Sequence, residues 1–465
     1  MRLSSYLILS ERLQRGSYAL QNGMTGAVEL ISEPLHDALL QLMQSSDPQQ
    51  TVIDEQIFST ELIETYLERG HFTELSHAQE RELLEKIASA LHQVARSRPS
   101  VVIVPELDCN YRCVYCFERT LQKGLKTQRT NMDKTEVDAV FAAIDQLAAG
   151  SDGIGQVVLY GGEPLQQKNL KLIEQIVSAG EARGISFMAV SNGHDLNAFL
   201  HLFSVDKISA LQITIDGLQE VHDRRRVALD GSSSFQRIIE NIRLAIEATD
   251  VKIVTRINLD DQNYPGFVDL LKVFEREGWL NHSQISINAA IVHVYDSCGA
   301  ASPLQDVSQI RAELDEVLSS YNNILLGSAE AITGSSVLSA LVYDRPSSLR
   351  SSFCAACSGM YIFLPNGQVS CCWEAIGDQR SLIGSYSAEG LELDEQRAEL
   401  WFGRSAAMID ECADCRYSLL CAGGCPQQAG ATDEALYQAN CCDFAKSYGW
   451  VLADAVEGFL KVGGL

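Results

Sequence analysis

Apolar strand-like runs and amphipathic helical segments alternate through the middle of the chain. The expected strands cover residues 101–107, 156–160, 185–190, 210–215, 251–258 and 284–292. The helical segments between them include residues 134–149, 170–180, 235–248 and 264–277. Parallel strands need crossover connections, and a parallel sheet covered by helices is built from near-continuous apolar strands. The pattern therefore predicts an α/β fold whose parallel sheet closes fully or partly into a barrel.

The first 97 residues have a different pattern. Strand-like runs at 6–9, 17–21 and 27–31 are separated by Gly16 and by the turn signal Asn22-Gly23. Three segments with helical spacing follow, at residues 35–43, 61–69 and 77–95. This order predicts a small winged-helix-like module, and a capping extension without a partner is the alternative.

Composition and charge narrow the possible locations and partners. The 465 residues include 61 acidic and 36 basic side chains, a net charge of -25, which disfavours nucleic acid and anionic membranes as partners. The apolar run at 6–9 is too short for a signal peptide, and no stretch approaches the ~18 apolar residues of a membrane span. We therefore expect a cytoplasmic protein.

The 14 cysteines are unevenly distributed along the chain. Three lie in residues 109–116 and ten in residues 354–442, while Cys298 stands alone. Cytoplasmic thiols stay reduced, so grouped cysteines indicate metal or cluster ligands before disulfides. Cys298 is most simply a buried small apolar residue, although its place after the sixth strand would also allow a substrate contact.

The first group of cysteines follows the first predicted strand of the barrel. Cys109, Cys113 and Cys116 can bind three corners of a four-iron cubane and leave the fourth iron without a protein ligand. An open coordination position is what a catalytic metal site requires. A structural zinc site completed by a distant residue is the alternative, but zinc ligands usually come as C-x2-C pairs.

Polar residues also follow the later strands, where the active sites of barrels lie. The second strand leads into Gly161, Gly162, Glu163 and Pro164, whose open backbone and carboxylate can bind an ammonium group. Ser191 and Asn192 follow the third strand and suit a ribose or carboxylate. Asp216 ends the fourth strand and Arg256 lies on the fifth. Residues 222–226, which include Arg226, either join this site or form a solvated charged loop.

These motifs and the barrel repeat resemble the radical S-adenosylmethionine (radical SAM) superfamily over about residues 100–300. The resemblance implies a [4Fe-4S] cluster on Cys109, Cys113 and Cys116, with SAM chelating its open iron. Reduction of the cluster would cleave SAM to a 5'-deoxyadenosyl radical that abstracts a substrate hydrogen. Glu163 and the adjacent glycines would hold the SAM ammonium, and Ser191 and Asn192 its ribose or carboxylate. The other implied cofactor-binding residues are Tyr115 and Phe117 beside the adenine, Pro164, Asp216, Arg226 and Arg256.

The C-terminal cysteines resemble the SPASM extension of radical SAM enzymes that modify peptides and proteins, over about residues 350–445. The matching spacings are Cys357-x9-Gly367-x4-Cys372 and Cys412-x2-Cys415-x5-Cys421-x3-Cys425, followed by Cys441-Cys442. The resemblance implies two auxiliary [4Fe-4S] clusters. Their ligands would be Cys354, Cys357, Cys372 and Cys425 for the first, and Cys412, Cys415, Cys421 and Cys442 for the second. The choice within the pairs Cys371-Cys372 and Cys441-Cys442 stays open, and Cys298 is the third spare cysteine.

The whole chain is thus expected to combine four parts. These are a winged-helix-like peptide-recognition module (1–97), a partial (β/α)6 TIM-like radical SAM barrel (98–310), a bridging helical segment (311–349) and a cysteine-rich SPASM domain (350–465). The module would bind the leader of a precursor peptide by pairing an edge strand with it. The expected activity is maturation of a ribosomal peptide by an intramolecular cross-link (C-C, C-O or thioether), with flavodoxin or ferredoxin as the electron donor.

Two alternatives remain from the sequence. One is a sulfatase-maturing or other protein-directed radical SAM dehydrogenase. It is disfavoured because sulfatase-maturing relatives have, directly after the corresponding cluster cysteine, an Asp that acts as a base. This chain has Trp373 and then Glu374 there. Glu374 either replaces that base or is a solvated carboxylate. The other alternative is a non-catalytic iron-sulfur electron carrier, which residues 161–164 disfavour.

Overall fold

The computed structural model describes most of the chain and groups it into two compact units. The described residues are 1–44, 58–116, 130–154, 156–291, 313–314, 317–318, 320–321, 323–326, 329–343, 345–430, 432–441 and 444–461. One unit, here the terminal unit, comprises Met1–Ala95, Ser328–Ser358 and Gly403–Leu465. The other, here the barrel unit, comprises Arg96–Gly327 and Gly359–Phe402. The units combine segments from several of the four predicted parts, whose limits stay a prediction.

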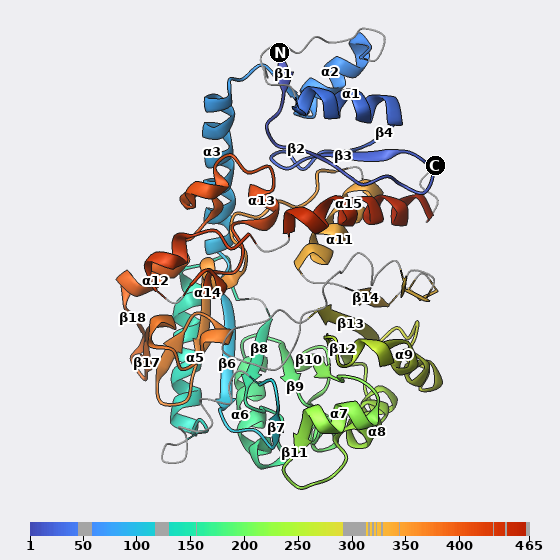
Figure 1. Ribbon diagram of the computed structural model, residues 1–465. Helices are drawn as coiled ribbons and strands as arrows, with labels where there is room; N and C mark the ends of the chain where they lie inside the picture. Colours follow the sequence, from blue (N-terminus) through green and yellow to red (C-terminus); the bar gives the residue numbers. More distant parts are fainter. Residues whose placement is uncertain are drawn as a thin grey trace. The chain divides into compact units, whose positions relative to one another are not determined.

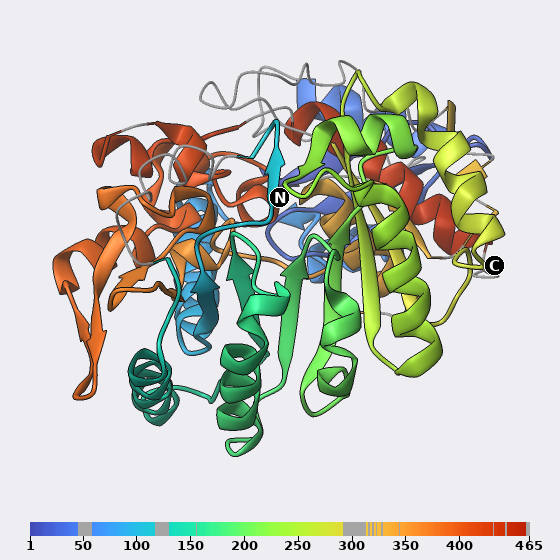
Figure 2. The same cartoon turned by 90° about the horizontal axis from the view of Figure 1, so that it is seen from below.

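The barrel unit is built on the predicted parallel sheet. Its strands are β6 (Ser100–Glu106), β8 (Val157–Gly161), β9 (Phe187–Ser191), β10 (Ile208–Thr214), β12 (Lys252–Leu259) and β13 (Ile285–Ile291). They pair in chain order, all in parallel, and β14 (Ile324–Leu326) continues the sheet beyond β13. Figure 2 shows them as an arc. Each of the six predicted strands is present within two residues of its expected ends, which confirms the α/β barrel prediction.

Helices cover the outer face of this arc. They are α5 (Lys134–Ala149), α6 (Leu170–Glu181), α8 (Ser234–Ala248) and α9 (Phe267–Arg276). Strand residues on the helix side, such as Ile213 and Ile287, are fully buried. Their neighbours on the inner side, such as Gln212 and Asn288, are only half-buried. The inner face and the carboxyl ends of the strands are therefore where a ligand can be held.

An antiparallel extension continues the sheet on its other side. Its strands are β15 (Met360–Phe363), β16 (Gln368–Ser370), β17 (Leu382–Ser387) and β18 (Gly390–Leu393), and β15 pairs in parallel with β6. These strands were not among those predicted from the sequence. The Asn366-Gly367 turn between β15 and β16 is the hairpin signal that could have revealed them. Cys371 and Cys372 follow directly after β16.

The terminal unit contains the predicted strands and helices of the N-terminal module. Three antiparallel strands, β2 (Leu7–Leu9), β3 (Tyr18–Asn22) and β4 (Val28–Ile31), form one small sheet. The helices are α1 (Glu33–Gln44), α2 (Thr60–Glu68) and α3 (His77–Arg96). A two-stranded sheet of β1 (Arg2–Leu3) and β5 (Phe72–Thr73) was not predicted.

The N-terminal sheet and the C-terminal helices share one hydrophobic core. Helices α11 (Ala329–Val342) and α15 (Phe444–Lys461) lie along each other in Figure 1. Ile8 of β2 belongs to the same buried cluster as Val337 of α11 and Leu452 of α15. The Tyr448 hydroxyl donates to Gln21 Oε1 of β3 at 2.8 Å. The N-terminal module is thus one packed body with the C-terminal segment.

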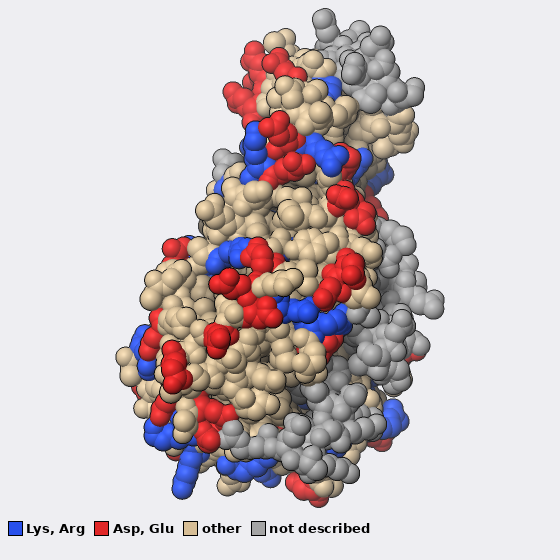
Figure 3. Space-filling model, turned by 90° about the vertical axis from the view of Figure 1, so that its left-hand side faces the viewer, with Lys and Arg blue, Asp and Glu red and all other residues tan. Residues whose placement is uncertain are grey.

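The described part of the chain contains no helix that is both long and apolar enough to cross a membrane. On the face shown in Figure 3, Asp and Glu side chains are interspersed with Lys and Arg.

The shared core predicts a clear contrast between two substitutions in the N-terminal sheet. We expect Ile8→Ala to lower the free energy of unfolding of the terminal unit by about 2–5 kcal/mol, because it leaves a cavity in this core. Leu30→Ala, on β4 but 46% exposed, should change it by less than about 0.5 kcal/mol. Urea denaturation followed by circular dichroism measures both, and equal effects would contradict the shared core.

Candidate functional site

The cysteine loop follows β6 and is folded back by a short pair of strands. β7 (Tyr111–Cys113) pairs antiparallel with β11 (Arg226–Ala228), with Cys113 opposite Arg226. The Cys109 sulfur accepts from the Tyr111 N–H at 3.3 Å, and Cys109 and Cys113 are each only 8% exposed. Cys116 is half-buried. All three cluster candidates therefore come from one loop at the carboxyl end of the first barrel strand.

Glu163 is a buried carboxylate beside this loop. It is 2% exposed and accepts hydrogen bonds from the Leu165 N–H at 2.9 Å, the Ser191 hydroxyl at 2.8 Å and the Asn192 N–H at 2.5 Å. Burial raises its pKa from 4.5 to about 7, and these three hydrogen bonds oppose that rise. A carboxylate held in this way has a strong need for a cation at neutral pH.

The preceding glycines bring the backbone of this motif against the cysteine loop. A Cβ atom at Gly162 would lie 2.4 Å from the Asp108 carbonyl oxygen and 2.5 Å from that of Leu107. No other residue type fits there without a shift of the backbone. Glycine at this position therefore allows the turn that carries Glu163 to lie directly against the residues before Cys109.

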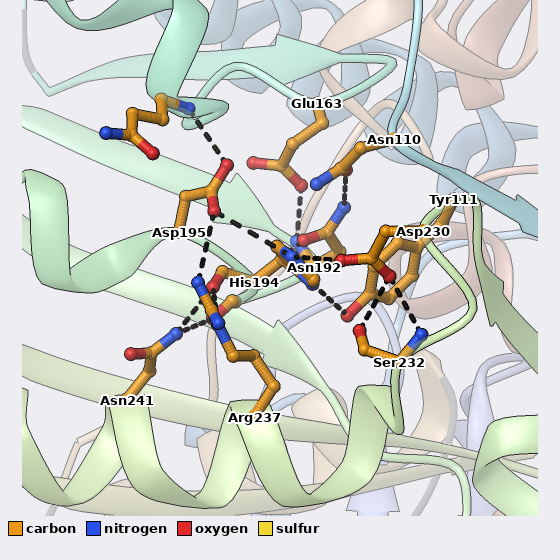
Figure 4. Close-up of polar contacts among 12 residues, drawn as sticks. Asn110, Tyr111, Glu163, Asn192, His194, Asp195, Asp230, Ser232, Arg237 and Asn241 are labelled. Atoms are coloured by element: carbon orange, nitrogen blue, oxygen red, sulfur yellow. Dashed lines mark hydrogen bonds and ion pairs between the residues drawn. The ribbon is translucent and has the colours of Figure 1, made fainter.

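Ser191 and Asn192 connect Glu163 to the cysteine loop. Besides binding Glu163, Asn192 donates through Nδ2 to Asn110 Oδ1 at 2.7 Å and contacts the Cys109 sulfur at 3.7 Å. Figure 4 shows the contacts of Asn192 with Glu163 and Asn110. The Ser191 hydroxyl and the Asn192 N–H thus hold Glu163, and the Asn192 side chain holds the loop, while their predicted contact with a ribose or carboxylate stays a prediction.

His194 extends this network and was not recognised from the sequence. The Tyr111 hydroxyl lies 3.2 Å from His194 Nδ1, and Asp230 lies 3.5 Å from Nε2 (Figure 4). The His194 carbonyl accepts from Arg237 and Asn241 of α8. The contacts of His194 link the cysteine loop to helix α8. In the sequence, the only local indication of this role was the turn after the third strand.

A second polar network surrounds Tyr115, next to Cys116. Its hydroxyl contacts the fully buried Asp216 and accepts from Arg226 Nη1 at 2.6 Å. The Arg225 guanidinium lies over the Tyr115 ring, 5.2 Å from its centre. Three of the predicted cofactor residues, Tyr115, Asp216 and Arg226, thus contact one another. Their contacts hold the Cys116 end of the cysteine loop in place. Phe117 lies outside the described residues.

The alternative of a solvated loop at residues 222–226 is wrong. These residues lie on α7 (Gln219–Arg225) and at the start of β11, and His222 and Arg225 are buried. Arg225 pairs with Asp260 at 2.7 Å, and the Asp216 N–H donates to His222 Nδ1. Burial lowers the pKa of His222 well below its ordinary value, with the two arginine charges acting in the same direction. The segment belongs to the buried support of the site.

Arg256 lies on the inner face of the sheet beside an unsatisfied acceptor. Arg256 and Asn288 are register partners on neighbouring parallel strands, so their side chains share one face. Arg256 Nε donates to Asn258 Oδ1 at 2.9 Å. The buried Oδ1 atom of Asn288 has no hydrogen-bond partner among the described residues. Such an orphaned acceptor suits a site that is completed by a bound polar ligand.

A comparison with known families identifies this arrangement. The model of the radical SAM superfamily matches residues 104–274, which span the cysteine loop, Glu163 and the polar residues described above. This chain contains a radical SAM domain.

Curated relatives match the radical SAM domain over different lengths. An S-adenosylmethionine-dependent nucleotide dehydratase of Psychrobacter lutiphocae is 28% identical over 32% of this chain, and the match covers 51% of the dehydratase. A cysteine-type anaerobic sulfatase-maturating enzyme of Clostridium perfringens is 20% identical, over 71% of this chain and 90% of the enzyme. The chain therefore matches about half of the first relative and most of the second.

Solved structures share the fold well beyond the domain. SuiB of Streptococcus suis, bound to S-adenosylmethionine, aligns with a TM-score of 0.53 and 16% identity over 95% of this chain and 99% of SuiB. The enzyme anSMEcpe with bound AdoMet aligns with a TM-score of 0.57 and 16% identity over 78% of this chain and 98% of its own. The likeness to SuiB includes the terminal unit.

The donors of the radical SAM domain fit a cluster with an open iron and SAM. Within the described residues, no three Cys, His, Asp or Glu side chains converge on a single metal ion. A cubane spreads its thiolates over several irons, so its ligands lie farther apart than those of one ion. Burial raises the pKa of Cys109 and Cys113, so binding iron must displace their protons. Glu163 could supply the carboxylate for the SAM ammonium, and the Asn288 Oδ1 atom could accept a hydrogen bond from a bound polar group.

The terminal unit contains two groups of the predicted auxiliary ligands. In one, Cys354 and Cys357 are joined by a hydrogen bond, and Cys425 lies close enough for its charge to act on Cys357. In the other, Cys412, Cys415, Cys421 and Cys441 act on one another electrostatically. Burial raises the pKa of Cys412 to about 12 and that of Cys421 to about 11. Cys441 therefore lies with the second group, whereas the predicted ligand Cys442, like Cys298, is outside the described residues.

The remaining predicted ligand, Cys372, belongs to the barrel unit. Cys371 and Cys372 are both buried, and the ring of Trp373 lies 5.4 Å from that of Tyr160, which directly precedes Gly161. Trp373 is 37% exposed and Glu374 is half-buried. The Cys372 loop therefore lies beside the strand that leads to Glu163. Trp373, one member of this aromatic pair, occupies the position after Cys372 at which the sequence comparison expects the Asp of sulfatase-maturing relatives.

The raised pKa of Glu163 predicts pH-dependent SAM binding. Below about pH 7 the carboxylate takes up a proton and loses its attraction for the SAM ammonium. We expect the affinity of the iron-loaded protein for SAM to be several-fold weaker at pH 6 than at pH 7.5, measured by anaerobic calorimetry. Glu163→Gln should bind more weakly and without this slope, while Glu181→Gln, at an exposed carboxylate of α6, should behave as wild type. A flat wild-type profile would contradict this role of Glu163.

Proposed function

We propose that the chain is a radical SAM enzyme that modifies a ribosomally made precursor peptide, most simply by an intramolecular side-chain cross-link. The observation that carries the proposal is the buried Glu163 held against the three-cysteine loop at the carboxyl end of the barrel. This pairing provides a place for a cluster with an open iron and a carboxylate for the ammonium of SAM. An electron carrier needs only the first of these.

The residues of the radical SAM domain divide the work around this centre. Cys109, Cys113 and Cys116 would hold the cluster, which together with SAM supplies a radical able to take a hydrogen atom from the substrate. Glu163 would bind the ammonium, and Asn192 fixes its orientation relative to Cys109. The inner side of the barrel, with Arg256 and Asn288, would receive polar groups of SAM or of the substrate.

A peptide substrate is supported by the terminal unit. Among the described strands, β4 pairs only with β3, so its other edge can accept an added strand from a leader peptide. The side chain of Leu30 on β4 is 46% exposed and offers an apolar contact. SuiB, whose fold this chain shares, has been crystallised bound to its precursor peptide SuiA.

A cross-link removes two hydrogens, so a second electron must leave the substrate after the first hydrogen is taken. The proposed auxiliary clusters, on the cysteines of the terminal unit together with Cys372, offer a route for that electron. Flavodoxin or ferredoxin would supply the electron that starts each cycle.

Sulfatase maturation is the second candidate, since the match to the sulfatase-maturating enzyme covers 90% of that protein. The Trp373–Tyr160 pair disfavours it, because an indole cannot serve as the base. Glu374 is the nearest carboxylate along the chain. A sulfatase peptide with Cys or Ser at the target position tests this candidate directly.

The reaction can be read by mass spectrometry. Reconstituted protein, SAM, reductant and the small peptide encoded beside its gene should give a product two hydrogens lighter, together with 5'-deoxyadenosine. Cys113→Ala should abolish both products, because the cluster loses a ligand. Val114→Ala, whose side chain is 43% exposed beside Cys113, should retain both. Deoxyadenosine production by Cys113→Ala would overturn the assignment.

Leader recognition has its own readout. Addition of the peptide should slow hydrogen exchange in β4, because its free edge gains hydrogen bonds. A proline at position 30 of β4 should reduce this protection, whereas Leu30→Ala should not abolish it, since backbone groups make the bonds. If exchange in residues 1–95 is unchanged by the peptide, the recognition role is wrong.

A further inference from the structure

Arg404 is a buried cation without an acidic partner among the described residues. It follows α12 (Glu395–Phe402) and is 1% exposed. Its guanidinium donates to backbone carbonyls of Gly423 at 2.9 Å, Gly424 at 3.0 Å and Gln438 at 3.2 Å, and also to that of Leu436. Burying a charge is unfavourable unless a counter-charge compensates it. Neutral carbonyls fix its geometry but leave its charge uncompensated.

The candidates for the counter-charge are the two cysteine groups of the terminal unit. In the first group the charge of Arg404 lowers the pKa of the Cys357 thiol and also acts on Cys354, and its Nη1 atom lies 3.0 Å from the carbonyl oxygen of Gly424, the residue before Cys425. In the second group its charge acts on Cys412. Arg404 is therefore in electrostatic contact with both groups.

Gly423 shows how close the second group lies. A Cβ atom at this glycine would be 3.4 Å from Arg404 Nη2 and also 3.4 Å from the Cys412 sulfur. The two atoms are thus no farther apart than the sum of these distances. A side chain at this position, where φ is +76°, would enter the space between the guanidinium and the sulfur.

Two other arginines act on thiols of the second group. Arg350 acts on Cys421 and Arg416 on Cys415, and both side chains are half-buried. Water screens their charges more than that of Arg404. Of the three, Arg404 combines full burial with contact to both groups.

We propose that Arg404 is the shared counter-charge of the two auxiliary cluster sites and raises the reduction potential of both clusters. Each one-electron reduction adds a negative charge to a cluster, and a buried cation nearby stabilises the reduced form. This inference rests on the proposed auxiliary clusters, and it assigns Arg404 a positioning and electrostatic role rather than a catalytic one.

The test is a potentiometric titration of the iron-loaded protein, with dithionite as reductant and electron paramagnetic resonance as readout. In Arg404→Gln both auxiliary potentials should shift to more negative values, while the SAM-responsive signal of the barrel cluster keeps its potential. Arg404→Lys should stay near wild type at neutral pH.

Arg2 provides the matched control. It is also buried, at 6% exposure, but it pairs with Glu80 at 2.7 Å, so Arg2→Gln should leave the potentials unchanged. Unchanged potentials in Arg404→Gln, or an equal shift in Arg404→Lys at neutral pH, would overturn the inference. If Arg404→Gln does not hold its clusters, Arg404→Met, which removes the charge and keeps a long side chain, is titrated instead, and auxiliary potentials equal to those of wild type would count against the proposal. A wild-type protein with the barrel signal alone would overturn the auxiliary clusters and this inference together, whereas unshifted auxiliary signals would overturn only the role of Arg404.

Discussion

The in-register pairing of the parallel strands is the constraint on which the site depends. It places the loops after β6, β8, β9 and β10 at one end of the sheet, so residues far apart in the sequence meet there. The same register sets Arg256 beside Asn288 on the inner face. A slip by one residue would turn these polar groups toward the helices and the isoleucines inward. The apolar packing of the outer face therefore also specifies the polar inner face.

Buried charged side chains are a second constraint on the structure, and they differ in how their charges are compensated. Glu163 is held by three hydrogen bonds yet keeps a raised pKa, which suits a carboxylate that awaits a cation. Arg225 has the nearby Asp260 as a conventional partner. Among the described residues, Arg404 donates to four backbone carbonyls, and its charge acts on nearby thiols. Glu163 and Arg404, which have no ion-pair partner among the described residues, are the two to which the proposed function assigns a charged ligand.

Much of the fold could be predicted from the sequence, because it is encoded in local periodicity. The barrel strands, their helices and the N-terminal elements all have continuous or amphipathic apolar patterns. The β15–β18 extension was not predicted, because its strands are short and the cysteine spacing suggested a separate domain. The shared core of β2, α11 and α15 was also not predicted. A sequence pattern shows that the face containing Ile8 is apolar, but it does not show which distant segment covers that face.

The candidate site divides in the same way. Motif spacing identified Cys109 and Glu163, but not that Asn192 would join them or that His194 would anchor the loop. Those contacts depend on side-chain directions that only the folded sheet defines. The spacing likewise did not show that Cys441 lies with Cys412 and Cys415 in the folded terminal unit, and the choice between Cys441 and Cys442 as ligand stays open.

The central claim is that the cysteines form three cluster sites, one in the radical SAM domain and two auxiliary. Iron and sulfide analysis after anaerobic reconstitution tests it most directly. Three [4Fe-4S] clusters predict about twelve irons per chain, falling to about eight when Cys109, Cys113 and Cys116 are all replaced by alanine. About four irons in the wild type, all lost in that triple variant, would contradict the account and leave only the cluster of the barrel.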